Sequence, residues 1–150
     1  MMSLVAIDLG KRVSGYARFR RSRLVYATEV LSRPTAAAMA RALVITDCGT
    51  GLPWYAEKMT DYAAKGGRSG DLEQLREIAR CIEGHGVDLR LVRAHSWKGS
   101  IPKSVERSRV LAELDEEEHM AILDLGKESV SAIGIGLVLT GRLGRGLVSR

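Results

Sequence analysis

Three acidic residues stand where carboxylates could serve a divalent cation. Asp8 ends the apolar segment "LVAID", Glu57 ends "WYAE", and Glu128 opens the small-residue-rich segment "ESVSAIGIG". Carboxylate oxygens are the ligands that Mg²⁺ prefers, and Mg²⁺ keeps several waters that a substrate phosphate can replace. If the first two segments are neighbouring strands, Asp8 and Glu57 meet at one edge of a sheet. The pattern is therefore typical of a Mg²⁺ site.

Each of these acids also has a structural interpretation. Asp8 suits a turn, because Asp followed by Gly favours turns. Glu57 fits a solvated strand position, and Glu128 fits the first turn of a helix, where the helix dipole favours an acid. Asp124, four residues before Glu128 but separated from it by Gly126, is the rival for a third carboxylate.

The elements that position these acids follow from the periodicity of the apolar residues. We expect strands at residues 3–9, 13–19, 21–31, 52–57 and 87–95. We expect helices at residues 32–44, 71–84, 104–119 and 128–143. The first helix has Ser32 as a candidate cap and Pro34 in its first turn. Three strands followed by alternating helices and strands predict an α/β fold with at least two crossover connections.

Length, charge and cysteine content indicate what class of protein this chain is. A chain of 150 residues with 45% hydrophobic residues predicts a single domain over residues 1–150. A net charge of +5 and a pI near 9.5 favour a polyanionic partner. Cys48 and Cys81 are too few for a disulfide framework, so we expect reduced thiols. No run approaches the ~18 apolar residues of a membrane span, so we expect a cytoplasmic protein without a membrane partner.

Four segments in order resemble one family. The segments "IDLGKRVSGYA", "YAEKM", "SWKGSIPKSVERSRVLAEL" and "ESVSAIGIGLVLTGR" resemble RuvC-type Holliday junction resolvases of bacteria and phages. The first two look like the strands that carry catalytic acids, the third like the Trp-Lys-Gly and Pro-Lys segment of phage-type members, and the fourth like the closing helix. They occur in the family's order and span residues 7–142, which is nearly the whole chain.

The resemblance implies an RNase H-like fold, namely a mixed sheet of about five strands with helices on both faces. It also implies a homodimer that hydrolyses phosphodiesters at four-way DNA junctions with Mg²⁺ or Mn²⁺, in the cytoplasm of a bacterium or a phage-infected cell. Asp8 and Glu57 correspond to metal ligands. The family's usual Asp before "AIGIG" is Ser131 here, a neutral and weaker ligand, and Glu128 on the same helical face would supply the missing carboxylate.

The same resemblance and the positive charge suggest DNA contacts. Lys98 and Lys103 would bind the scissile phosphate beside the acids and offset its developing charge. The predicted DNA-binding residues are Arg18, Arg20, Arg21, Arg23, Tyr62, Lys65, Arg68, Trp97, Lys98 and Lys103. Trp97 also fits core packing, Tyr62 an ordinary surface position, and the segment "RFRRSR" a solvated turn.

Three functions compete at this stage. The first is a metal-dependent endonuclease that resolves four-way junctions, with Asp8, Glu57, Glu128, Lys98 and Lys103 as catalytic residues. The second is a protein of the same fold that binds junctions but has weakened or lost cleavage, marked by Ser131. The third is a nucleotide-binding protein, because "IDLG" also opens the phosphate hairpin of actin-like ATPases. At 150 residues the chain lacks their second lobe.

Overall fold

A five-stranded mixed sheet forms the centre of the computed structural model, which describes residues 1–57, 69–93 and 103–143. The strands are β1 (Leu4–Asp8), β2 (Val13–Arg20), β3 (Arg23–Leu31), β4 (Trp54–Glu57) and β5 (Leu89–Val92). Their order across the sheet is β3-β2-β1-β4-β5. All five predicted strands are therefore present, and β1 lies in the middle of the sheet.

The sheet changes from antiparallel to parallel at β1. Strand β2 runs antiparallel to β1 and β3, whereas β4 runs parallel to β1 and β5 runs parallel to β4. The first three strands form the predicted meander, joined by short turns. Helical connections lead to the parallel strands. Because β1 and β4 are parallel neighbours, their carboxyl ends lie at the same end of the sheet.

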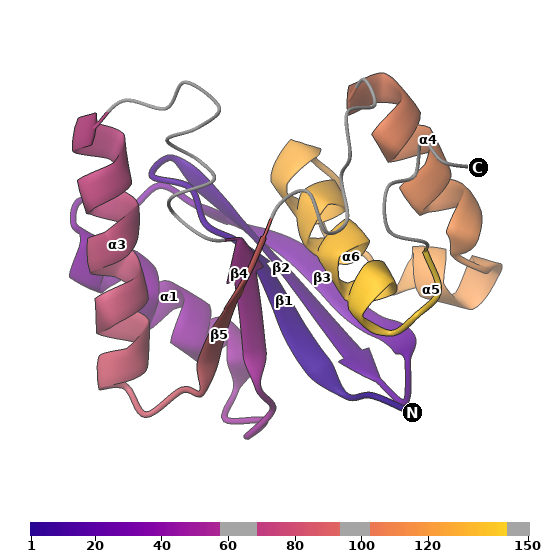
Figure 1. The fold of residues 1–150 in the computed structure, drawn as a ribbon, viewed down its shortest axis with the longest axis horizontal. Coiled ribbons are helices and arrows are strands. Elements are labelled where there is room, and N and C mark those ends of the chain that lie inside the picture. The colour runs from indigo at the N-terminus through magenta and orange to yellow at the C-terminus, as the bar shows by residue number, and fades with distance from the viewer. Residues whose placement is uncertain (58–68, 94–102, 144–150) are drawn as a thin grey trace.

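Helices cover both faces of the sheet (Figure 1). The helices are α1 (Ala36–Asp47), α3 (Ser69–Gly84), α4 (Lys103–Glu113), α5 (Glu116–Met120) and α6 (Lys127–Leu139). Helices α1 and α3 lie on one face, and α4, α5 and α6 lie on the other.

Alternation along β1 divides the core into two layers. Leu4 and Ala6 pack with α6, whereas Val5 and Ile7 pack with α1 and α3. Because side chains alternate along a strand, Asp8 belongs to the face that α6 covers.

The observed helices differ from the predicted ranges, and capping explains two of the differences. Helix α1 begins at Ala36 because the Thr35 hydroxyl accepts the Ala38 N–H at 3.1 Å, so neither Ser32 nor Pro34 is part of its first turn. The expected helix 104–119 is divided into α4 and α5. Asp115 interrupts it, because its side chain accepts the Glu118 N–H at 2.9 Å and starts a new helix.

A buried ion pair joins the end of α6 to the β2–β3 hairpin. The Glu118 side chain is 1% exposed, and its carboxylate pairs with Arg142, which donates to Oε1 at 2.8 Å and also to Oε2. The backbone N–H of Leu24 donates to Glu118 at 2.7 Å, and Arg142 donates to the Ser22 carbonyl at 3.1 Å. Burial alone would raise the pKa of Glu118, but the bonds from Arg142, Leu24 and Asp115 hold it below its ordinary value.

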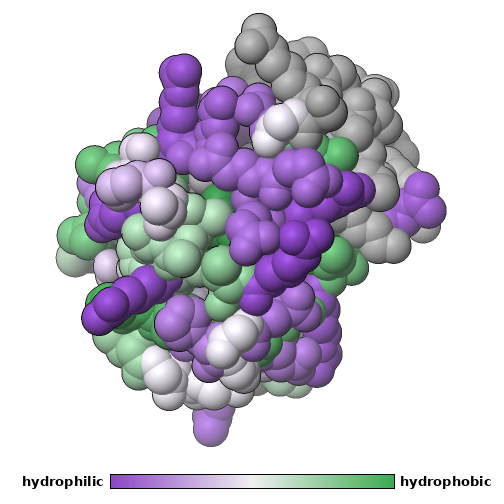
Figure 2. Space-filling view, turned by 90° about the vertical axis from the view of Figure 1, so that its left-hand side faces the viewer, coloured by the Kyte–Doolittle hydropathy of each residue, from purple (hydrophilic) through white to green (hydrophobic). Residues whose placement is uncertain are grey.

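The outer surface of α1 and α3 is mainly hydrophilic, with hydrophobic residues showing between the polar ones (Figure 2). Ion pairs between Glu73 and Arg76 and between Glu77 and Arg80 lie on α3. Cys48 and Cys81 are free thiols, as predicted. Across residues 1–57, 69–93 and 103–143, no helix has the length and apolar character needed to cross a membrane.

Candidate metal centre

Four residues form one row across the sheet. Asp8 pairs with Gly15, and Gly15 pairs with Glu29. On the other side of β1, Ile7 pairs with Ala56, so the next residues along these parallel strands, Asp8 and Glu57, end side by side. Paired residues on neighbouring strands point to the same face, about 4.8 Å apart from strand to strand. The predicted meeting of Asp8 and Glu57 at one sheet edge is therefore supported by the register.

The first turn of α6 lies over this row. A Cβ atom added to Gly15 would lie 2.0 Å from the Glu128 carbonyl oxygen and 2.8 Å from the Ser129 nitrogen. Only glycine lets the helix approach β2 this closely. Since Gly15 is the partner of Asp8, this contact brings the start of α6 to the same edge of the sheet as the Asp8–Glu57 pair.

Ser131 and Glu128 occupy one side of α6, three residues apart. Ser131 is 5% exposed, and within the part of the chain that the structure describes its hydroxyl has no hydrogen-bond partner. A buried hydroxyl without a partner is uncommon. Glu128 is only partly buried. Helix α6 therefore carries two oxygen-bearing side chains on one side, and its Glu128 backbone lies against Gly15 of the row.

These donors fit Mg²⁺ chemically. All are oxygen atoms, and Mg²⁺ is commonly held by one or two carboxylates together with waters and substrate phosphates. Over residues 1–57, 69–93 and 103–143, however, no three His, Cys, Asp or Glu side chains are grouped closely enough to hold a metal ion. The structure thus brings Asp8 and Glu57 together as a pair, whereas Glu128 and Ser131 as ligands remain predictions.

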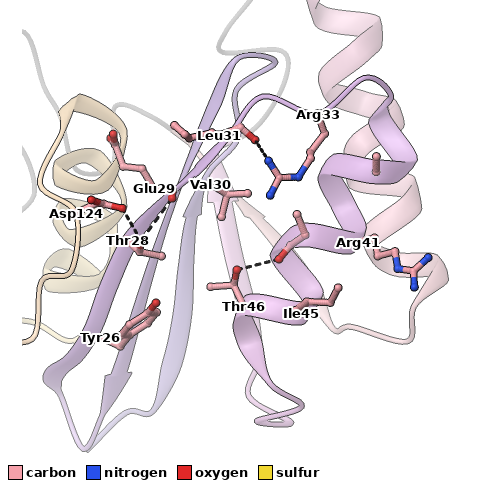
Figure 3. Close-up of a pocket in the computed structure, with 12 residues that line it drawn as sticks. Tyr26, Thr28, Glu29, Val30, Leu31, Arg33, Arg41, Ile45, Thr46 and Asp124 are labelled. Atoms are coloured by element: carbon pink, nitrogen blue, oxygen red, sulfur yellow. Dashed lines mark hydrogen bonds between the residues drawn. The ribbon is translucent and has the colours of Figure 1, made fainter.

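Asp124, the rival third ligand, lies elsewhere. Its carboxylate accepts a hydrogen bond from the Thr28 hydroxyl at 3.3 Å on the edge strand β3. It lines a cavity of about 580 Å³ between β3 and α1, with Arg33 and Arg41 on the opposite side (Figure 3). Two strands separate β3 from β4, so Asp124 is not part of the Asp8–Glu57 pair.

The predicted DNA-binding hairpin lies at the other end of the sheet. Phe19 of β2 pairs with Leu4, the first residue of β1, so the turn at Arg21 is separated from Asp8 by the length of β1, roughly 13 Å. Arg20 and Arg21 are exposed, whereas Arg23 pairs with Asp115 at 2.6 Å.

Arg18 has structural contacts on the face covered by α1. Its guanidinium lies 5.5 Å from the ring centre of Tyr16 and 5.3 Å from that of Tyr26, and it donates to the Thr46 carbonyl at 3.2 Å. Burial and the hydrogen bond to Asp47 raise the pKa of Tyr16, so this tyrosine stays protonated. Phosphate contact by Arg18 would compete with these interactions and remains a prediction.

Several predicted site residues lie outside the described residues. They are Tyr62, Lys65, Arg68, Trp97 and Lys98. Lys103 is the first residue of α4, but nothing is described of its side chain.

Sequence reasoning missed Glu29. Its Oε2 atom accepts the backbone N–H groups of Glu128 at 3.0 Å and Ser129 at 3.1 Å. The one signal in the sequence is an acid within the mainly apolar strand segment "YATEVL". Its partners lie 99 and 100 residues further along the chain, so no local pattern could identify them.

The fold of this chain is similar to the folds of several solved structures. RuvC of Thermus thermophilus is similar at a TM-score of 0.60 and 14% identity, with 94% of this chain and 98% of that chain covered. The same protein in complex with a Holliday junction substrate gives 0.56 and 14%, with 91% of each chain covered. The large terminase nuclease of thermophilic phage G20c gives 0.50 and 9%, with 91% of this chain and 81% of that chain covered. No protein-family model and no curated protein sequence matches the chain.

These likenesses confirm the predicted fold class. The chain has the mixed five-stranded sheet with helices on both faces that is found in RuvC and in related nucleases of the RNase H-like fold.

Proposed function

We propose that this protein is a metal-dependent endonuclease that cuts branched DNA, with four-way junctions as the preferred substrate. The observation that carries the proposal is the placement of Asp8 and Glu57 side by side, at the carboxyl ends of the adjacent parallel strands β1 and β4. The RuvC-like fold supports the same function, since one of the similar structures holds a Holliday junction substrate.

In this proposal Asp8 and Glu57 hold Mg²⁺ or Mn²⁺, and Glu128 and Ser131 complete the site from α6. An ion held there would supply charge stabilisation at the phosphate and a lowered pKa of water at the site. Lys98 and Lys103 help to hold the phosphate. The chain's own contribution is to align the phosphodiester with the site and to neutralise the charge that develops on it.

The proposal includes a homodimer. Resolution of a junction requires two symmetric cuts, and two active sites related by a two-fold axis meet that need. The net charge of +5 supports binding to the phosphate backbone of the junction arms.

The direct test is incubation of an end-labelled four-way junction with Mg²⁺, with Mn²⁺ and with EDTA. We expect paired symmetric cuts with either metal and none with EDTA. Linear duplex and flap substrates of the same length serve as controls, and equal cutting of all substrates would reject junction selectivity. Light scattering on the free protein measures the expected dimer.

A second candidate is a junction-binding protein with weak or absent cleavage. It is favoured by Ser131 in place of the family's usual Asp, and by the lack of a group of three acids in the described part of the chain. Tight junction binding in EDTA, together with no cleavage in either metal, would select this candidate.

A further inference from the structure

Glu29 is connected to the candidate site by hydrogen bonds from backbone N–H groups of α6. It is the β3 member of the row that contains Gly15 and Asp8. One of its carboxylate oxygens accepts two backbone N–H groups, from Glu128 at 3.0 Å and Ser129 at 3.1 Å. Figure 3 shows its side chain extending from β3 toward the side of Asp124, away from Arg33 and Arg41.

The start of α6 is therefore fixed from two directions. From the sheet, Gly15 contacts the backbone of Glu128. From the edge strand, Glu29 binds the N–H groups of the first turn. Gly126 leaves room for this carboxylate, because an added Cβ would lie 2.3 Å from Glu29 Oε1. The Ser129 hydroxyl closes the turn by accepting the Gly126 N–H at 2.8 Å.

An acid at a helix start commonly offsets the helix dipole without any further role. Such acids usually belong to the helix itself or to the residues just before it. Glu29 instead comes from a strand 99 residues earlier in the chain, so its hydrogen bonds fix the helix relative to the sheet. Its Oε2 atom is already engaged by two N–H groups, which argues against Glu29 as a metal ligand.

We propose that Glu29 is a positioning residue that holds the first turn of α6, and with it Glu128 and Ser131, over the Asp8–Glu57 pair. By doing so, Glu29 sets the affinity of the site for Mg²⁺ or Mn²⁺. The inference rests on the metal site of the proposed function. It adds that Glu29, a residue of β3, determines where Glu128 and Ser131 of α6 lie.

The test compares Glu29→Ala, which removes the acceptor, with Glu29→Gln, which keeps an acceptor oxygen but not the charge. Gly126→Ala is a second, independent way to displace the carboxylate. Glu83→Ala, an exposed acid on α3, is the matched control. Each full-length variant is checked for folding by circular dichroism and thermal melting. Three quantities are then measured: amide hydrogen exchange at residues 128 and 129, Mn²⁺ affinity without DNA by electron paramagnetic resonance, and junction cleavage.

We expect Glu29→Ala and Gly126→Ala to accelerate exchange at both amides and to weaken Mn²⁺ binding about tenfold. Glu29→Gln is expected to retain Mn²⁺ affinity within about threefold, and Glu83→Ala to behave as the wild type. Cleavage in the two displaced variants is expected to recover at high metal concentration, with junction affinity unchanged.

Faster exchange with unchanged Mn²⁺ affinity would overturn the proposal and leave Glu29 as a helix cap. A Glu29→Gln variant as weak as Glu29→Ala would also overturn it, because charge and not position would then be the cause. If the wild type binds Mn²⁺ but cuts no DNA, the proposed nuclease function fails. In that case an Mn²⁺ affinity that falls in Glu29→Ala and not in Glu29→Gln would still support the positioning role.

Discussion

Gly15 and Glu128 are in contact through their backbones, so that a Cβ atom on Gly15 would lie 2.0 Å from the Glu128 carbonyl oxygen. This contact joins the central part of the sheet to the helix that carries the remaining candidate ligands. A backbone carbonyl cannot rotate away as the end of a flexible side chain can, so the close approach depends on glycine.

We therefore predict that Gly15→Ala destabilises the protein by about 1–3 kcal/mol, since overpacking forces the backbone to shift. Urea denaturation measures this loss. Gly84→Ala is the control, because nothing lies within 4 Å of a Cβ added at Gly84 in α3. A Gly15→Ala variant as stable as wild type would show that the start of α6 moves freely.

Asp8→Asn is expected to abolish cleavage in Mg²⁺ and in Mn²⁺ while junction affinity stays the same or increases. The change removes an anionic ligand and a charge that repels phosphate, but it preserves the size of the side chain. Cleavage assays and gel-shift titrations in EDTA separate the two effects. Parallel loss of binding and thermal stability would instead assign Asp8 a structural role.

The sequence was sufficient to predict the strands and helices that a local periodic pattern of apolar residues defines. The five strands were predicted, and Asp8 and Glu57 were placed at strand ends because apolar runs stop there. Their side-by-side position was conditional on strand order, which local patterns do not encode. The resemblance to RuvC-type resolvases supplied the fold class that the structure confirms.

What could not be predicted depends on contacts between distant residues. Asp115 breaks the expected helix 104–119 by capping, and an acid in a charged segment gives little sign of this. The anchoring of α6 by Glu29 and the pairing of Glu118 with Arg142 join elements far apart in the chain. Such pairs become visible only when the sheet and its covering helices are assembled.

The Glu118–Arg142 pair predicts a specific pH dependence of stability. Because the pKa of Glu118 in the folded protein lies below its ordinary value of 4.5, the pair stabilises the fold above that pH. This stabilisation is lost as the pH falls through the lower, folded-state value. Urea unfolding of the wild type from pH 7 to pH 3 should show the loss.

Glu118→Gln should remove about 3 kcal/mol at pH 7, because the largely buried Arg142 loses its main charged partner and keeps only the longer ion pair with Glu113 at 3.6 Å. The difference from wild type should shrink at acidic pH. Glu117→Gln, at a side chain that is 89% exposed, is the control and should change stability by less than ~0.5 kcal/mol. A pH-independent difference would show that packing, not ionisation, accounts for the role of Glu118.

The hairpin arginines make a separate prediction about DNA affinity. If Arg20 and Arg21 contact phosphates of a junction arm, the double change to Ala should lower the log–log salt slope of binding by roughly 0.9 for each lost contact. Cleavage at saturating protein should be unchanged, because this turn lies at the other end of β1 from Asp8. An unaltered salt slope would remove the hairpin from the DNA interface.

Substitutions at Ser131 and Glu128 separate the two proposed functions. If Glu128 replaces the acid that RuvC-type resolvases usually carry where this chain has Ser131, the wild type should cut junctions with Mg²⁺, and Glu128→Gln should silence it while binding persists. If it does not, cleavage by the wild type should be slow or absent. Ser131→Asp should then raise the rate, because it adds an anionic oxygen at a buried position whose hydroxyl has no partner in the described part of the chain.

We expect Ser131→Asp to raise the cleavage rate, as measured by single-turnover cleavage. Ser131→Asn is the control, because its side chain is of similar size to Asp but has no charge. Strong wild-type cleavage that neither Ser131→Asp nor Glu128→Gln alters would exclude both as ligands, and Asp124→Asn would become the next variant to measure.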